Sequence, residues 1–153
     1  MLGHRGCPVF PMVSRSIGHG RGCAWLFLAQ PLVARVGTSG PDIRPVWFLW
    51  EGGAFWWLTG SYSRLEQLLA EDSRVALVID TCDVSAGTVF SVTCRGVAEV
   101  VPLDRARAVR KLTRYLGPED RWPVRFSAPL DDPATKMVRL APDRPPRLQD
   151  RSW

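Results

Sequence analysis

The segment Thr59–Glu66 combines the residue types that are best suited to bind a phosphate group. Ser63, followed three residues later by Glu66, is typical of a capping box and predicts the start of a helix. A helix N-terminus exposes unpaired N–H groups, and Arg64 adds a guanidinium that can hold a phosphate through two hydrogen bonds. The pattern indicates an anion-binding turn, while a plain capped helix with a solvated arginine fits the same residues.

The composition indicates one globular domain without a strong charge bias. The chain has 153 residues, of which 46% are hydrophobic and 10% are aromatic, so it can form a substantial core. The formal net charge is +5, but Arg5, Arg15 and Arg21 precede the first acidic residue, and the remainder is nearly balanced. We therefore expect no nucleic-acid partner.

The cysteines and histidines do not form a metal site or a catalytic triad. Both histidines, His4 and His19, lie in the opening segment, which excludes a Ser-His-Asp triad in the body of the chain. The cysteines lack paired zinc spacing, and we expect free thiols in a reducing cytoplasm and no bound metal. The four cysteines are Cys7, Cys23, Cys82 and Cys94.

Residues 1–22 differ from the rest of the chain because they are rich in Gly, Arg, Ser and Pro and contain no acidic residue. We predict a loose N-terminal arm over 1–22 and a single domain over 23–153. A mitochondrial-type presequence is the competing interpretation of the arm, although Gly and Pro interrupt its helical pattern. The apolar run Cys23–Leu28 is too short for a membrane span, so we expect no membrane partner.

Turn residues divide the domain into short segments, most of which have the pattern of strands. Glu51-Gly-Gly separates Val46–Trp50 from Ala54–Thr59 and predicts a hairpin. Asp104 predicts the N-cap of a helix that runs to Leu116, with Gly117 just beyond its end. The other predicted elements are a short helix from Trp25 to Gln30, strands over Leu32–Thr38, Val75–Asp80 and Lys136–Ala141, and a segment Thr88–Val101 that is either one bent strand or two strands joined at Gly96.

These elements predict a mainly β fold, an antiparallel barrel of about six strands with peripheral helices. Most connections are too short for the crossover helices of a parallel sheet. Residues 118–135 contain four prolines and are expected to form an ordered loop or an active-site cover. No glycine-rich phosphate loop is present, which argues against a Rossmann enzyme or an NTPase.

Several landmarks occur in an order that is found in one known family. An arginine opens a strand at Arg44, a threonine ends its neighbour at Thr59, and Ser63-Arg64 precedes a helix. Ser73-Arg74-Val75 and Gly96–Glu99 match two further strand motifs. Over roughly residues 32–141 the chain resembles the pyridoxamine 5′-phosphate oxidase-like, flavin-binding split-barrel family. The resemblance implies a split β-barrel and a cofactor site formed by Arg44, Pro45, Val46, Trp47, Thr59, Ser63 and Arg64.

The chain departs from the family pattern where charges are expected around the phosphate. Leu65 and Leu49 replace two lysines, and Ser91 replaces a flavin-contacting glutamine. The C-terminal Arg-x-His element that true pyridoxamine phosphate oxidases use for substrate is missing, so vitamin B6 oxidation is not expected. The link from Thr38 to Pro45 is shorter than in related chains, and we expect the strand after it to lose pairing and part of the cofactor wall.

The segment Pro45–Phe48 and the short acidic-Gly turn after it resemble the branch that uses FMN or the deazaflavin coenzyme. The resemblance implies an oxidoreductase that moves a hydride to or from a small planar substrate, with no catalytic side chain. It also implies a homodimer with the cofactor at the interface. The alternative is a degenerate or non-catalytic dimeric binder of flavin, haem or a similar flat ligand.

The hairpin tryptophans can serve either as a ring-binding surface or as barrel core. Strand alternation places Trp47 with Leu49 on one face and Phe48 with Trp50 on the other, so only part of the set can contact a ligand. Trp56 and Trp57 raise the same two alternatives. In the proline-rich loop, Trp122 is a candidate lid or partner-subunit contact.

Overall fold

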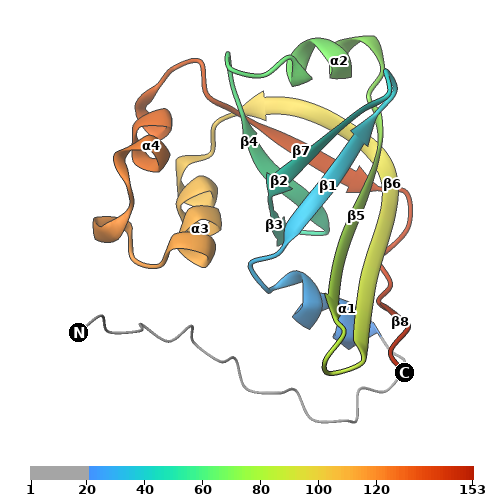
Figure 1. Cartoon of the computed structure of the whole chain (residues 1–153). Helices are drawn as coiled ribbons and strands as arrows, with labels where there is room; N and C mark the ends of the chain where they lie inside the picture. The colour runs from blue at the N-terminus through green and yellow to red at the C-terminus, as the bar shows by residue number, and fades with distance from the viewer. Residues whose placement is uncertain (1–20) are drawn as a thin grey trace, which may run out of the picture.

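The fold is organised around one antiparallel sheet, which the computed structural model describes over residues 21–153. The strand order is β2-β1-β5-β6-β7-β4-β3, and β8 pairs with β6 off this path. The sheet curls around its own core (Figure 1), which confirms the predicted mainly β split barrel. The strands are β1 Val33–Thr38, β2 Asp42–Trp47, β3 Leu49–Glu51, β4 Ala54–Thr59, β5 Arg74–Asp83, β6 Thr88–Pro102, β7 Lys136–Pro142 and β8 Gln149–Asp150.

The described helices lie around the sheet rather than between its strands. They are α1 Arg21–Leu28, α2 Leu65–Glu71, α3 Arg105–Leu116 and α4 Val124–Ser127, with short 3-10 turns at Glu119–Arg121 and Ala128–Asp131. Helix α2 lies at one end of the sheet, and α3 and α4 lie together on one side (Figure 1). The Asp104 side chain accepts a hydrogen bond from the Arg107 N–H at 2.9 Å, so the predicted cap of α3 is confirmed.

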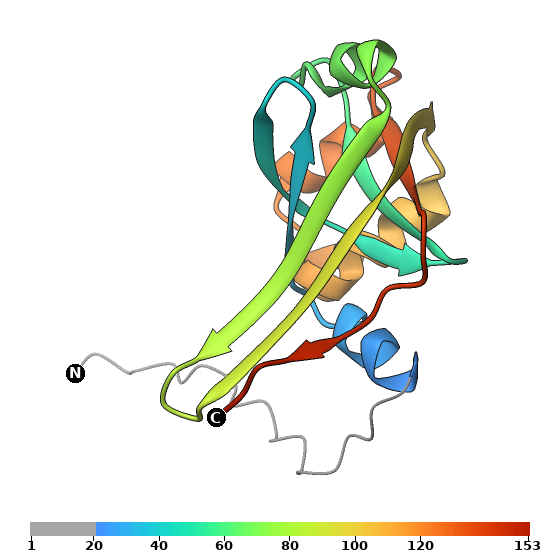
Figure 2. The same cartoon turned by 90° about the vertical axis from the view of Figure 1, so that its right-hand side faces the viewer.

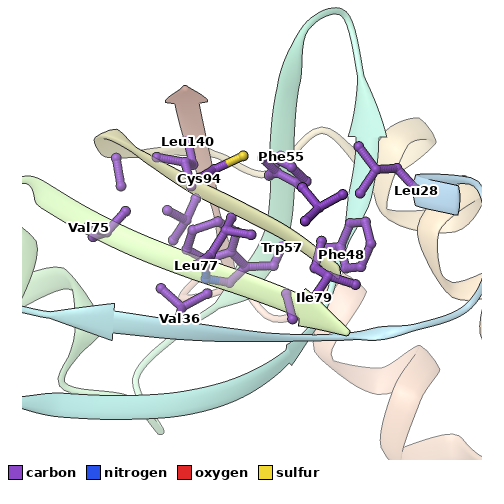
Figure 3. Close-up of a cluster of buried hydrophobic side chains, with 14 of the residues drawn as sticks. Leu28, Val36, Phe48, Phe55, Trp57, Val75, Leu77, Ile79, Cys94 and Leu140 are labelled. Carbon is purple, nitrogen blue, oxygen red and sulfur yellow. The ribbon is translucent and has the colours of Figure 1, made fainter. Parts of the chain in front are cut away.

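The core fills the concave side of the sheet with alternate side chains from every long strand. Leu77 and Ile79 of β5, Val92 of β6 and Trp57 of β4 are almost completely buried there. Figure 3 shows these strands meeting around Trp57, with Phe48 and Leu28 at one end of the cluster. A second, smaller apolar cluster joins α3 to the loop after it.

Strand β6 resolves the alternatives left by the sequence, because it is one continuous strand through Gly96. A Cβ added at Gly96 would lie 2.1 Å from the carbonyl oxygen of Ala141 on β7, so only glycine permits this close approach. The β5–β6 hairpin extends well beyond the rest of the sheet, and β8 runs beside it (Figure 2). The segment after β7 thus contributes a short strand to the sheet.

The expectation that the short link after Thr38 disrupts strand pairing is wrong. Strands β1 and β2 form a tight hairpin whose register runs from Thr38 opposite Asp42 to Val33 opposite Trp47. A short turn suffices because an antiparallel pair needs only a few connecting residues. The predicted strand Val46–Trp50 therefore belongs to two strands, β2 and β3.

Phe48 separates β2 from β3 because its backbone bonds to a side chain instead of a strand. The Phe48 N–H donates to the Tyr115 hydroxyl at 3.0 Å, and its side chain is fully buried. The same hydroxyl lies 2.7 Å from the Leu32 carbonyl oxygen and can donate its proton there. Tyr115 of α3 thus ties the end of β2 to the start of β1.

Of the predicted N-terminal arm 1–22, residues 1–20 lie outside the described part of the chain, while Arg21 and Gly22 begin α1.

Within the described residues, Cys82 is an exposed free thiol and Cys94 is a buried one. Burial raises the pKa of the Cys94 thiol to about 11. No described helix has the length and apolar character that crossing a membrane requires.

Candidate functional site

The turn after β4 presents Ser63 in a geometry that differs from the predicted capping box. The Ser63 N–H donates to the Gly60 carbonyl at 3.0 Å, and the Ser63 hydroxyl oxygen accepts from the Leu65 N–H at 3.1 Å. The N-cap of α2 is Arg64, whose side chain makes no capping bond. Glu66 instead accepts from Lys136 at 2.5 Å. The capping box is therefore wrong, because Lys136 on β7 holds the glutamate away from the helix start.

Arg44 reaches this turn from strand β2, across the end of the sheet. Its Nη1 donates to the Ser63 hydroxyl oxygen at 2.9 Å, which joins two residues 19 positions apart in the sequence. Its Nη2 donates to the carboxylate of Asp42. Asp42 and Arg44 are two positions apart on one strand and therefore share a face. The predicted neighbours Arg44 and Ser63 are thus in direct contact.

Two polar atoms of the predicted site are buried without a hydrogen-bond partner in the described structure. They are Nε of Arg44 and Oγ1 of Thr59. Ser63 adds a third available group, because its oxygen already accepts from Arg44 and Leu65 and its own proton has no acceptor in the described part of the chain. Buried polar groups are normally paired, and each unpaired one costs about 1–3 kcal/mol. The site therefore offers unsatisfied hydrogen-bonding groups of the kind that an oxyanion requires.

The remaining predicted site residues spread away from Arg44. The Arg64 side chain is exposed and makes no polar contact with the described residues, so its guanidinium is accessible to an anion. Pro45 is exposed, and Val46 packs against the barrel core. The Trp47 ring belongs to the second apolar cluster. The residues with free donors are thus concentrated near the β4–α2 turn.

The aromatic residues serve mainly as structural contacts within the chain. Trp47 stacks on Tyr115 and Phe126 with ring centroids 4.7 and 5.2 Å apart. Trp57 is core, and the Arg107 guanidinium lies 3.8 Å from the Trp56 ring centroid. Contacts within the protein therefore account for most of the predicted tryptophan surface, and no ligand is needed to explain it.

Trp122 is not the predicted lid or partner contact, since it is only 8% exposed. Its Nε1 donates to the Gly117 carbonyl at 2.8 Å, and its ring packs with Leu112 and Leu130. The proline-rich loop is ordered because Trp122 attaches it to α3.

The two positions at which the family pattern has lysine lie in the interior of this protein. Leu65 is 1% exposed in the main core, and Leu49 is 4% exposed. A charged side chain at either position would strongly destabilise the fold. Ser91, at the position of the expected glutamine, pairs with Gln149 of β8. The positively charged side chains that remain at the predicted phosphate site are therefore those of Arg44 and Arg64.

An open cavity of about 480 Å³ adjoins the turn on the side of β7. It is lined by the Glu66–Lys136 pair and by apolar residues that include Val100 and Leu130. Lys136 is the register partner of Thr59, so the cavity begins next to the end of β4. Its volume is in the range of small-molecule sites.

Other titratable groups give no sign of a catalytic cluster in the described residues. No group of three or more potential metal ligands is present among them. Burial lowers the pKa of the Lys111 amine to about 8, but Lys111 lies on α3 beside the Trp47 ring and contacts no predicted phosphate residue. The site is therefore suited to binding an anion rather than to acid–base chemistry by side chains.

The family model described as pyridoxamine 5′-phosphate oxidase matches residues 21–145, which is most of the chain. The chain belongs to the pyridoxamine 5′-phosphate oxidase-like family. The match includes every predicted site residue from Arg44 to Arg64 as well as β6 and β7. No curated protein matches the sequence.

Several solved structures share the fold of this chain at low sequence identity. A conserved hypothetical protein from Mycobacterium tuberculosis superposes with a TM-score of 0.67 at 20% identity, over 91% of this chain and 90% of that chain. An F420 reductase has a TM-score of 0.55 at 19% identity, over 80% and 92%. An FAD-binding protein from Mycobacterium smegmatis has a TM-score of 0.56 at 20% identity, over 86% and 96%. These likenesses establish the split-barrel fold.

Sequence reasoning missed the ion pair between the Asp42 carboxylate and Arg44. Asp42 lies inside the predicted link Thr38–Pro45, whereas in the structure it is the first residue of β2. An Asp two positions before an Arg was the available signal, since such a pair shares one face of any strand.

Proposed function

We propose that this protein binds the phosphate end of a flavin-type cofactor, FMN or the deazaflavin coenzyme, at Arg44, Ser63, Arg64 and Thr59. The observation that supports this most strongly is the contact between Arg44 and Ser63, beside which Arg44 Nε and Thr59 Oγ1 are buried without partners. A phosphate has oxygens that accept from such donors, and charge-assisted bonds to arginine are among the strongest available. Family membership and the likeness to an F420 reductase and to an FAD-binding protein point to the same class of ligand.

The chain's own residues would bind and orient the cofactor rather than react. A flavin or deazaflavin supplies two-electron hydride chemistry when it is bound. Arg44 and Ser63 would hold the phosphate against the end of the sheet, and Arg64 would neutralise its remaining charge from the solvent side. The cavity beside Lys136 offers apolar wall for a flat ring or substrate. We propose an oxidoreductase that acts on a small planar substrate.

A homodimer is part of this proposal, because the family resemblance implies a cofactor between two subunits. The exposed apolar residues of the sheet, including Ile43 and Val97, are available for such a contact. Light scattering on the protein as it elutes from a size-exclusion column measures its mass directly. A monomer of 17.1 kDa at micromolar concentration would contradict the dimer.

The binding test is a titration of the purified protein with FMN and, separately, with the deazaflavin coenzyme, followed by tryptophan quenching. We expect saturable binding of at least one of the two. The double variant Ser63→Asp, Arg64→Glu places two negative charges at the proposed phosphate site and removes one positive charge, and it should abolish that binding. Arg121→Glu, at an exposed arginine of the loop after α3, is the control for a change of net charge. Equal affinity of wild type and double variant would refute the phosphate site.

Turnover is tested separately from binding. Reduction of a dye by the protein with reduced coenzyme supports the oxidoreductase assignment. Saturable binding without turnover of any flat substrate would contradict the catalytic part of the proposal. The protein would then be interpreted as a non-catalytic flavin binder.

A further inference from the structure

Asp42 takes up part of the hydrogen-bonding capacity of Arg44. The Asp42 carboxylate accepts from Arg44 Nη2, while Nη1 is held by Ser63. The Arg44 side chain is 22% exposed and the Asp42 side chain is 41% exposed, so both partners of the ion pair are accessible from solvent. An incoming phosphate would meet the carboxylate together with the arginine.

We propose that Asp42 is an internal competing anion, which holds Arg44 in place in the free protein and sets how tightly the site binds a phosphate. The proposal rests on the proposed function and adds a residue that determines the affinity and selectivity of that site. Two physical effects act in the same direction. The carboxylate takes up guanidinium donors that a phosphate could use, and its negative charge repels a phosphate that carries about −1.5 to −2.

The geometry of β2 makes this competition unavoidable. Asp42 and Arg44 share a face of the strand, and the backbone of both is fixed by the register with β1. Asp42 begins the strand directly after the short turn at residues 39–41, so its side chain can rotate into solvent when it is displaced. The carboxylate is therefore a removable ligand of Arg44 rather than a buried structural partner.

The substitution Asp42→Asn removes the negative charge of the side chain and keeps its shape. The asparagine carbonyl can still accept from Arg44 Nη2, so the arginine keeps its orientation, but the repulsion and most of the competition disappear. A partly exposed ion pair together with repulsion at this range predicts FMN affinity about threefold to tenfold higher than in the wild type. Riboflavin lacks the phosphate, and its affinity should not change.

The matched control is Asp80→Asn. Asp80 pairs with Arg35 on the same sheet, between β1 and β5, and is similarly exposed at 44%. This variant changes the net charge of the protein by the same amount but should leave FMN affinity within error of the wild type. Raising the salt concentration should reduce the difference between Asp42→Asn and wild type, because the repulsion is screened.

The experiment is a titration of wild type, Asp42→Asn and Asp80→Asn with FMN and with riboflavin. A selective gain for FMN in Asp42→Asn supports the inference. Weaker FMN binding in that variant, or equal changes for FMN and riboflavin, would overturn it, because either result indicates a purely structural role.

The inference fails separately from the proposed function. If no protein in the set binds FMN or the deazaflavin coenzyme, the proposed function is refuted, and the same proteins are titrated with inorganic phosphate while the Arg44 Nε–H resonance is followed by NMR. A shift at lower phosphate concentration in Asp42→Asn supports the competing role of Asp42. Identical titration curves would overturn it.

Discussion

Two arginines of this protein are equally buried but have different surroundings. Arg107 on α3 has a side-chain exposure of 23%, and Arg44 on β2 has one of 22%. Arg107 donates to Glu51 at 2.7 Å, pairs with Asp104 at 3.0 Å and lies over the Trp56 ring. Arg44 bonds Ser63 and Asp42, and its Nε has no partner in the described structure.

The difference distinguishes an arginine that stabilises the fold from one that is available to a ligand. Glu51 lies at the turn of the β3–β4 hairpin and accepts from both Arg107 and Arg110, so this network attaches the hairpin to α3. At the opposite end of β4, next to Thr59, two buried polar atoms, Arg44 Nε and Thr59 Oγ1, have no hydrogen-bond partner in the described structure. The two arginines are alike in burial and charge, so incomplete hydrogen bonding is the feature that distinguishes Arg44 from Arg107.

The largest expected difference between the two regions follows from replacing each arginine. Arg44→Gln should lower FMN affinity about 30-fold, or ~2 kcal/mol, because a charge-assisted contact is lost. Arg107→Gln is the matched variant and should reduce stability while FMN affinity stays unchanged. Tryptophan quenching and urea denaturation measure the two quantities. Similar losses of affinity in both variants would remove the distinction.

Lys111 is the exception in the region around α3, because its side chain is largely buried and its amine lies 6.0 Å from the Trp47 ring with no ion pair to a described residue. Lys111→Met should raise the free energy of unfolding by about 2 kcal/mol at pH 7, since a desolvated charge is removed. The folded-state pKa of about 8 lies below the usual 10.5. The unfolded chain therefore binds the proton more tightly, and wild-type stability should rise between about pH 8 and 10.5.

The gain from Lys111→Met should accordingly shrink across this window. Denaturant unfolding of both proteins at pH 7 and at pH 9.5 measures it. A difference that does not depend on pH would show that packing, rather than charge burial, controls the effect.

Thr59→Val tests whether the unsatisfied hydroxyl is retained for a ligand. Removal of a buried hydroxyl without a partner should stabilise the free protein by about 1 kcal/mol, and FMN affinity should fall severalfold. Thr38→Val is the control, because Thr38 Oγ1 is also buried without a partner but lies on β1. It should give the stability gain without the loss of affinity. Equal affinity in both variants would exclude Thr59 from the site.

Glu51→Gln gives the smallest expected effect, a loss of about 0.5–1 kcal/mol of stability, because this network is partly exposed. Hydrogen bonds from Arg110 and then Arg107 lower the pKa of the Glu51 carboxyl. Its stabilisation is therefore present above the unfolded-state pKa near 4.5 and is lost as the pH falls through the folded-state pKa. Unfolding from pH 7 to pH 3 measures this. FMN affinity at pH 7 should not change.

Local patterns in the sequence were sufficient to predict most elements of the fold. The hairpin around Gly52 and Gly53 and the Asp104 cap depend on residues within a few positions, and both occur as predicted. Alternating apolar residues predicted the strands, and the family pattern indicated the split barrel. The ends of β2 and β5 were misplaced, because their extent depends on pairing with distant strands.

The sequence by itself determined which residues could bind an anion, since Arg44, Thr59, Ser63 and Arg64 were identified from type and spacing. Only the tertiary structure decided which hydrogen bonds these residues make. Ser63 bonds Arg44 rather than capping α2 with Glu66, and Asp42 bonds Arg44, because sheet pairing brings β2 to the β4–α2 turn. Hydrogen bonds act over a few ångströms, so partners far apart in sequence are chosen by the packing of the whole sheet.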